Sequence, residues 1–271
     1  MKTLPQRIAA CIAVSLACTL PAKAATFSVD YTDLWYIPAE SGWGLNLIQQ
    51  NNVIFATLFV YGTDQTPRWY VASDLEGSSG TSFSGTLYRT SGAYFGAPWT
   101  TGGPPTVAGS MTLIFTSPTQ ATLTYTADGV TVTKSIVRQT WRAENLTGNY
   151  LGGLTAVASS CNGVDNGNVL IFGRPVTVAH NTNGAMSMTV NFNTSSGAAS
   201  VCTFNGSYTQ AGKLGNFAGT WSCTVGSSPF NNGTFTLSEL QSTVRGFNGK
   251  FVAQDQLCHY DGNFGVVRDV Q

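Results

Sequence analysis

Alternation of large and hydroxyl side chains about a tight turn constrains the fold of this chain more than any other feature. Residues 121–126 and 130–133 alternate in this way, and an Asp-Gly dipeptide at 128–129 separates them. Asp-Gly between two alternating runs is among the strongest short-range signals of a β-hairpin. Alternate residues of a strand face opposite sides of a sheet. We therefore expect an antiparallel hairpin with Leu123 and Tyr125 on one face and threonines on the other.

The stretch from Trp35 to Ala72 repeats this pattern and concentrates aromatic residues. Three short extended runs carry the rings, and turn signals at 50–52 and 62–67 separate them. Consecutive antiparallel strands are punctuated in this way. We interpret this stretch as the nucleus of a β-barrel.

Similar runs continue along the whole chain, and no segment has helical periodicity. In the first half, strands are expected near 43–50, 53–61, 68–74, 82–89, 107–116, 119–126 and 130–141. In the second half, they are expected near 148–153, 168–179, 185–193, 201–209, 215–225, 233–240, 245–253 and 258–267. Sequential strands joined by short turns form a meander, which loses its open edges when it closes into a barrel.

The predicted fold is therefore all-β, with two consecutive antiparallel meander β-barrels of about eight strands each. Alternation lapses at 142–145, a short polar stretch that reads Arg-Ala-Glu-Asn. We place the boundary there, which gives an N-terminal barrel domain over residues 25–143 and a C-terminal, disulfide-bonded barrel domain over residues 144–271. A glycine- and proline-rich segment at 97–106 interrupts the first half and is expected to be a loop, because proline is confined to the margins of strands.

The first residues have the order of a secretory signal peptide. Two basic residues precede an apolar run over 8–20, and Ala-Lys-Ala follows at 22–24. This order of charged, apolar and small residues is typical of export signals. We expect a signal peptide over residues 1–24, cleavage near Ala24, and export to the periplasm or the medium. The alternatives are lipid attachment at Cys18 and an uncleaved anchor, although the apolar run is shorter than the ~20 residues that span a bilayer.

The charge of the mature chain argues against several kinds of partner. The chain has 13 basic and 13 acidic residues, and loss of Lys2, Arg7 and Lys23 leaves 10 basic against 13 acidic, a formal charge of −3. No basic patch favours nucleic acid, and no run of Lys and Arg favours an anionic membrane. An outer-membrane barrel needs a lipid-facing apolar band, whereas the outward-facing sides of the predicted strands carry Thr and Ser. We expect no membrane span in the mature form, and the oligomeric state stays open.

Four cysteines remain in the mature chain, all in its second half: Cys161, Cys202, Cys223 and Cys258. An even number in an exported chain indicates two disulfides, and four buried thiols are the alternative. No two of them have the close spacing of zinc ligands. Neither of the two histidines, His180 and His259, is accompanied by carboxylates or cysteines at a spacing that would let them bind one metal ion. No metal and no other cofactor is expected.

One disulfide can be derived from strand register. If residues 212–213 form a two-residue turn, Cys202 lies opposite Cys223 on the face that also carries the large aromatic rings. Directly opposed strand residues lie within disulfide range. The remaining pair, Cys161 and Cys258, would tie the loop after the first strand of this half to its last strand. The alternative connectivity joins Cys161 to Cys202 and Cys223 to Cys258.

Glu40 is the most conspicuous carboxylate, because it lies between two tryptophans. A glycosidase needs a second carboxyl ~5 to 9.5 Å away, and Asp33 and Asp74 are the candidates. In the structural alternative, Glu40 accepts hydrogen bonds from Ser41 and nearby backbone amides, or it pairs with Arg68 where the first strand enters the barrel. The sequence contains no Gly-x-Ser-x-Gly nucleophile motif and no phosphate-binding glycine loop.

Four aromatic residues are candidate ligand-binding residues: Trp43, Trp69, Tyr94 and Trp99. Such rings are more often part of a core, but Tyr94 and Trp99 lie among glycines and prolines, where packing alone does not explain them. The leading expectation is a non-catalytic exported protein that binds a small apolar ligand or a carbohydrate. The alternatives are a glycan hydrolase that uses Glu40 with Asp33 or Asp74, and a structural surface-interaction module.

Residues 35–44 read WYIPAESGWG, and Arg-Trp-Tyr at 68–70 and SGTLYR at 84–89 follow. These motifs resemble uncharacterised exported bacterial β-rich proteins with a W-x-x-P-x-E-S-G-W-G signature. The resemblance covers about residues 33–142 and implies an exported β-rich module without an assigned catalytic residue. The second half, with GNFAGTW at 215–221, is similar in rhythm to avidin-like and lipocalin-like barrels, which hold one small ligand.

Overall fold

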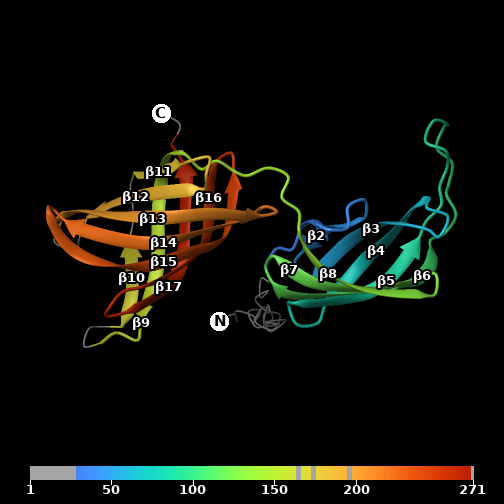
Figure 1. Ribbon diagram of the computed structural model, residues 1–271, viewed down its shortest axis with the longest axis horizontal. Helices are drawn as coiled ribbons and strands as arrows, with labels where there is room; N and C mark the ends of the chain where they lie inside the picture. Colours follow the sequence, from blue (N-terminus) through green and yellow to red (C-terminus); the bar gives the residue numbers. More distant parts are fainter. Residues whose placement is uncertain (1–28, 163–165, 172–174, 194–196, 270–271) are drawn as a thin grey trace, which may run out of the picture.

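The computed structural model of this protein describes residues 29–162, 166–171, 175–193 and 197–269. The expected signal peptide at 1–24 lies outside these residues. All the elements are β-strands, and they form two antiparallel barrels that follow one another along the chain (Figure 1). Within the described residues, we find no helix of the length and apolar character needed to cross a membrane.

The first barrel is closed and contains eight strands in sequence order. They are β1 (Asp33–Tyr36), β2 (Gly44–Gln50), β3 (Val53–Tyr61), β4 (Pro67–Gly77), β5 (Ser82–Arg89), β6 (Thr106–Ser117), β7 (Gln120–Ala127) and β8 (Val130–Arg138). Strand β1 pairs with both β2 and β8 and closes the barrel. The seven expected runs correspond to β2–β8, whereas β1 is not among them.

The inward faces of these strands form a continuous apolar core. Trp35 is fully buried and donates a hydrogen bond of 3.0 Å from Nε1 to the main-chain oxygen of Tyr31. The ring of Tyr31 stacks on Phe115 with 3.5 Å between centroids. The largest side chains without exposed surface include Leu45, Leu47, Ile54, Leu58, Leu75, Phe83, Leu87 and Leu113. Side chains therefore fill the interior of this barrel, which is one of the two arrangements known for eight-stranded barrels.

The hairpin formed by β7 and β8 confirms the prediction from the Asp-Gly dipeptide. Asp128 and Gly129 both have positive φ, 50° and 85°, as a two-residue hairpin turn requires. Leu123 and Tyr125 are buried, and the outward threonines form cross-strand pairs such as Thr124–Thr133 at 3.1 Å.

Within the described residues, the second barrel contains nine strands in eight positions. They are β9 (Gly148–Ser159), β10 (Gly167–Ile171), β11 (Val176–His180), β12 (Ala185–Asn193), β13 (Ala199–Ala211), β14 (Leu214–Val225), β15 (Ser228–Thr243), β16 (Gly246–Gln254) and β17 (His259–Arg268). In the backbone register, Ile171 of β10 pairs with Leu154, and Val176 of β11 pairs with Tyr150. Both strands thus pair with one edge of β9, whose other edge pairs with β17 and closes the barrel. The expected run 168–179 corresponds to β10 and β11 together.

The register of β13 and β14 is the predicted one. Cys202 faces Cys223 across the two strands, and Phe204 faces Trp221. Disulfides join Cys202 to Cys223 and Cys161 to Cys258. The register argument therefore selects the observed connectivity over its alternative.

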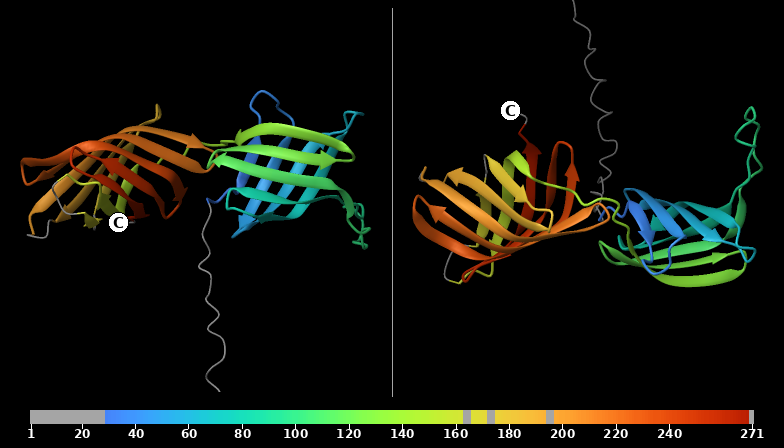
Figure 2. Two further views of the ribbon diagram at one scale, coloured as in Figure 1. Left: turned by 90° about the horizontal axis from the view of Figure 1, so that it is seen from below. Right: turned by 45° about the horizontal axis from the view of Figure 1, so that its top comes forward.

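The connection between the barrels runs from Arg138, where β8 ends, to Gly148, where β9 begins. The expected boundary at 142–145 lies within this segment. In an antiparallel meander, odd-numbered strands all end on the same side. The turns after β1, β3, β5 and β7 thus share the distal end of the first barrel, away from the second barrel (Figure 2). Arg138 is the last residue of β8 and therefore lies at the opposite, proximal end.

Candidate functional site

A bulge in β4 reshapes the outer wall of the first barrel. Ala72 faces Ala56 on β3, but Leu75 faces Ile54, so β4 contains one extra residue between these pairs. As a result, Ser73 and Asp74 are both exposed, although they are neighbours, and Leu75 returns to the core. Bulges of this kind redirect side chains and bend the strand.

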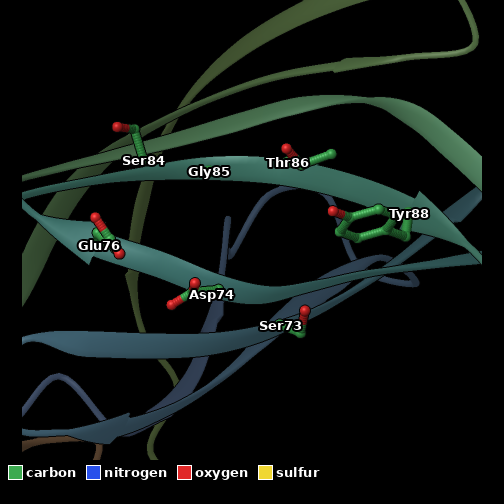
Figure 3. Close-up of a pocket in the computed structure, with 7 residues that line it drawn as sticks. All are labelled: Ser73, Asp74, Glu76, Ser84, Gly85, Thr86 and Tyr88. Carbon is green, nitrogen blue, oxygen red and sulfur yellow. The ribbon is translucent and has the colours of Figure 1, made fainter.

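The bulge opens a groove of about 250 Å³ between β4 and β5. Its lining residues are Ser73, Asp74, Glu76, Ser84, Gly85, Thr86 and Tyr88. Figure 3 shows Asp74 and Glu76 on one strand and Ser84, Thr86 and Tyr88 on its neighbour. The groove thus combines two carboxylates with hydroxyl groups and one aromatic ring.

Gly85 permits the close contact between the two strands at the bulge. A Cβ atom at this position would lie 2.3 Å from the main-chain oxygen of Asp74. Any larger residue would therefore push β5 away from the bulge and change the shape of the groove.

The two groove carboxylates are available to a ligand. Neither the Asp74 carboxylate nor the Glu76 carboxylate has a hydrogen-bonding or ion-pair partner among the residues that the structure describes. This distinguishes them from the other acidic candidates, Glu40 and Asp33, which are both paired.

An exposed aromatic row continues the groove toward the distal end. Val71 faces Tyr88 across β4 and β5, and Trp69 lies two residues before Val71 on the same outward face, about 7 Å along the strand. Trp69 is 52% exposed and faces Phe59, which is also exposed. On its other side, Phe59 faces Gly44, which has no side chain to cover the ring. The outer wall therefore presents flat aromatic surface beside the polar groove.

Trp43 lies in a different place from Trp69. Gly44 faces Phe59 on the outer side of the wall. Trp43 directly precedes Gly44, so it faces inward, and it packs against the barrel core. Its Nε1 donates a hydrogen bond of 2.9 Å to Glu40, and the ammonium of Lys134 lies 5.0 Å from its ring centroid. Trp43 and Glu40 thus meet at the distal end, but the structure does not bring them together with the groove.

Glu40 forms an ion pair with Lys134, at 2.5 Å between Nζ and Oε2. The hydrogen bond from Lys134 lowers the pKa of Glu40, and a further bond from Trp43 acts in the same direction. The alternative in which Glu40 pairs with Arg68 is not found, because Arg68 at the start of β4 pairs with Asp64 in the preceding turn.

Asp33 lies at the proximal end, where it forms an ion pair of 3.0 Å with the buried guanidinium of Arg138. It also accepts hydrogen bonds from the main-chain N–H groups of Leu34 and Lys213. This carboxylate is held in a structural network, and Asp74 faces outward on β4. The structure therefore does not place Asp33, Glu40 and Asp74 in one common groove.

Tyr94 and Trp99 lie in the loop between β5 and β6, with exposed fractions of 69% and 80%. Figures 1 and 2 show this loop projecting from the distal end of the first barrel. The four expected ligand-binding aromatics thus fall into three places: the barrel rim, the outer wall and the projecting loop.

Sequence reasoning did not single out most groove residues, because the expected strand over 68–74 ends inside the bulge. The signal that could have identified them is local. Two consecutive polar residues, Ser73 and Asp74, interrupt an alternating run that resumes with Leu75, which is the pattern of a bulge.

Comparison with known proteins leaves the family of this chain open. No protein-family model matches the sequence, and no curated protein matches it. Among solved structures, a similar chain is a Bacteroides fragilis protein provisionally described as an outer membrane protein. The two chains are 13% identical, the match covers 90% of this chain and 98% of that chain, and the TM-score is 0.28. At this identity and score, we base no conclusion on the similarity.

Proposed function

We propose that this is an exported, non-catalytic protein that binds carbohydrate on the outer wall of its first barrel. The observation that carries the proposal is the groove between β4 and β5. It places two unpaired carboxylates and several hydroxyl groups next to the half-buried ring of Tyr88 and the exposed ring of Trp69.

These groups suit the two kinds of surface on a sugar ring. Aromatic side chains offer a large apolar face at small entropic cost, and the C–H face of a sugar can stack on it. Carboxylates accept hydrogen bonds from hydroxyl groups, and such charge-assisted bonds are roughly twice as strong as neutral ones. Asp74 and Glu76 would bind the sugar hydroxyls, and Trp69 would extend the contact along the wall.

A small apolar ligand has less support. A site for such a ligand needs an apolar cavity, whereas the interior of the first barrel is occupied by buried side chains such as Trp35, Phe83 and Met111. The groove on the outer wall is lined mainly by polar groups, which favours carbohydrate.

Hydrolysis also has less support than binding. A glycosidase holds its general acid in surroundings that favour the protonated form, but Asp74 and Glu76 are exposed on an open wall. Glu40, the residue that the sequence suggested, is engaged with Lys134.

Export is supported by the two disulfides, because disulfides persist in oxidising compartments. The pairs Cys161–Cys258 and Cys202–Cys223 tie the second barrel together. N-terminal sequencing of the secreted protein tests this part of the proposal, and Ala25 is the expected first residue.

A glycan array tests the binding proposal. We expect the purified protein to bind a restricted set of oligosaccharides, and Trp69→Ala and the double variant Asp74→Asn/Glu76→Gln to lower the affinity by about tenfold or more. Trp141→Ala is a matched control, because Trp141 is exposed but lies in the connection between the barrels. Equal affinities of all variants would exclude this site.

A further inference from the structure

The loop between β5 and β6 projects from the distal end of the first barrel, and it is rich in aromatic residues and free of charged ones. We call residues 90–105 the aromatic loop; they include no Asp, Glu, Lys or Arg. Figures 1 and 2 show that the loop extends beyond the barrel, away from the second barrel.

The aromatic loop has a defined shape. A turn at its tip joins the N–H of Ala97 to the oxygen of Tyr94 at 3.2 Å. Its two arms run close together, because a Cβ atom at Gly102 would lie 2.6 Å from the main-chain oxygen of Ser91. The turn presents Phe95 at the tip, packed against Tyr94 with 4.8 Å between the ring centroids.

The rings of the aromatic loop are unusually exposed for their size. Phe95 is 94% exposed, Trp99 is 80% exposed and Tyr94 is 69% exposed. Large apolar side chains gathered on a surface in this way mark an interaction site more often than chance exposure does. Phe95 has no hydrogen-bonding group, so no hydrogen bond to water offsets the free-energy cost of exposing its apolar ring.

We propose that the aromatic loop inserts its tip into the interface of a lipid bilayer with zwitterionic headgroups. Trp and Tyr are enriched at the level of the headgroups, where one edge of the ring is apolar and the other can bond to water. Phe95 at the tip would enter the acyl boundary, and Tyr94 and Trp99 would lie at headgroup level. This contact is peripheral and is separate from the carbohydrate groove.

The chemistry of the loop backbone supports this partner. Unpaired N–H groups are costly in apolar surroundings, and three prolines, Pro98, Pro104 and Pro105, remove such donors from the loop. The absence of charge means that no ion has to lose its hydration shell when the tip enters the interface. The nearest strand-end charge, Arg89, is already paired with Asp128 at 3.2 Å, so anionic lipid is not required.

Vesicle flotation with phosphatidylcholine tests this proposal. We expect the purified protein to float with these vesicles, and raised sodium chloride not to release it, because screening by salt weakens interactions between charges and not the burial of apolar rings. The double variant Phe95→Ser/Trp99→Ser should weaken binding by about tenfold or more, since it removes two of the three inserted rings. Trp99→Phe should retain most of the binding.

Phe230→Ser is the matched control, because Phe230 is 70% exposed but belongs to the second barrel. This variant should bind the vesicles like the wild type. The proposal would be overturned by a wild-type protein that stays unbound, or by a Phe95→Ser/Trp99→Ser variant that binds equally well. It would also be overturned by binding that needs anionic lipid and disappears in salt, or by sedimentation data showing that the loop instead joins two copies of the chain.

Discussion

The main-chain N–H of Lys213 donates a hydrogen bond of 2.8 Å to Oδ2 of Asp33, which joins a turn of the second barrel to the first strand of the first barrel. The same oxygen accepts a bond of 3.0 Å from Arg138, whose side chain is fully buried. The ammonium of Lys213 lies 2.5 Å from a carboxylate oxygen of Asp30. The β13–β14 hairpin and the proximal end of the first barrel thus share one network of four charges.

Removal of the charge of Asp33 should destabilise the first barrel. Asp33→Asn would leave the buried guanidinium of Arg138 without its ion-pair partner, and breaking a buried pair costs about 3 kcal/mol or more. We expect this loss in the free energy of unfolding measured with urea. Asp261→Asn, which changes an exposed carboxylate on β17, is the control and should unfold like the wild type.

Gly212 is the residue of the hairpin that fits most closely against the first barrel. It has a φ of +59°, and a Cβ atom there would lie 2.1 Å from Oδ2 of Asp33. Gly212→Ala should therefore displace the hairpin and weaken the contact between the two barrels. Limited proteolysis would detect this change as faster cleavage within residues 139–147.

Gly226 provides a control for the cost of backbone conformation alone. Its φ is +60°, and a Cβ atom there would meet nothing within 4 Å. Gly226→Ala should therefore carry similar backbone strain without faster cleavage of the connection. Identical cleavage of the two variants would show that the hairpin does not hold the barrels together.

The contact between Lys213 and Asp30 should weaken in acid. Burial alone would raise the pKa of Asp30, but hydrogen bonds from Lys213 and Thr32 outweigh burial and hold that pKa below its ordinary value of 3.8. A group with a lowered folded pKa stabilises the fold above its unfolded pKa, and this contribution disappears as the pH falls through the folded pKa.

Urea unfolding between about pH 6 and about pH 2 measures this effect. The wild type should lose more stability than Lys213→Gln over this range, because the variant has no ammonium near Asp30. Parallel curves for the two proteins would contradict the assigned role of this ion pair.

The two disulfides should contribute unequally to stability. The cysteines of one pair, Cys161 and Cys258, are 97 residues apart, and those of the other, Cys202 and Cys223, are 21 residues apart. In the chain-entropy model, the longer loop is worth about 5 kcal/mol and the shorter loop about 3 kcal/mol. Calorimetry of Cys161→Ala/Cys258→Ala and Cys202→Ala/Cys223→Ala should show the larger loss in the first variant; the reverse order would contradict the model.

The sequence predicts those parts of the fold that depend on local patterns. The Asp-Gly turn at 128–129 and the register around 212–213 are confirmed, because alternation and short turns are encoded within about 20 residues. Strand β1 is not predicted, because Asp33–Tyr36 has only four residues and is too short to show alternation. Its ion pair joins residues 105 positions apart in the chain, a separation for which a single sequence gives no signal.

The candidate site is harder to predict for a related reason. Trp43 and Trp69 look equivalent in the sequence, but one faces the barrel interior and the other faces outward, and only the register of β2, β3 and β4 decides this. The bulge at Ser73 and Asp74 then shifts the alternation by one residue. The groove depends on that shift, so it becomes visible only in the folded wall.

Mapping of amide chemical shifts by NMR during titration with the best-bound oligosaccharide tests the proposed function most directly. We predict that the largest changes occur in the wall around the groove, at Ser73–Glu76 and Ser84–Tyr88, and that they extend to Trp69. Changes concentrated in the second barrel or around Glu40 and Trp43, with the β4–β5 wall unaffected, would contradict the account.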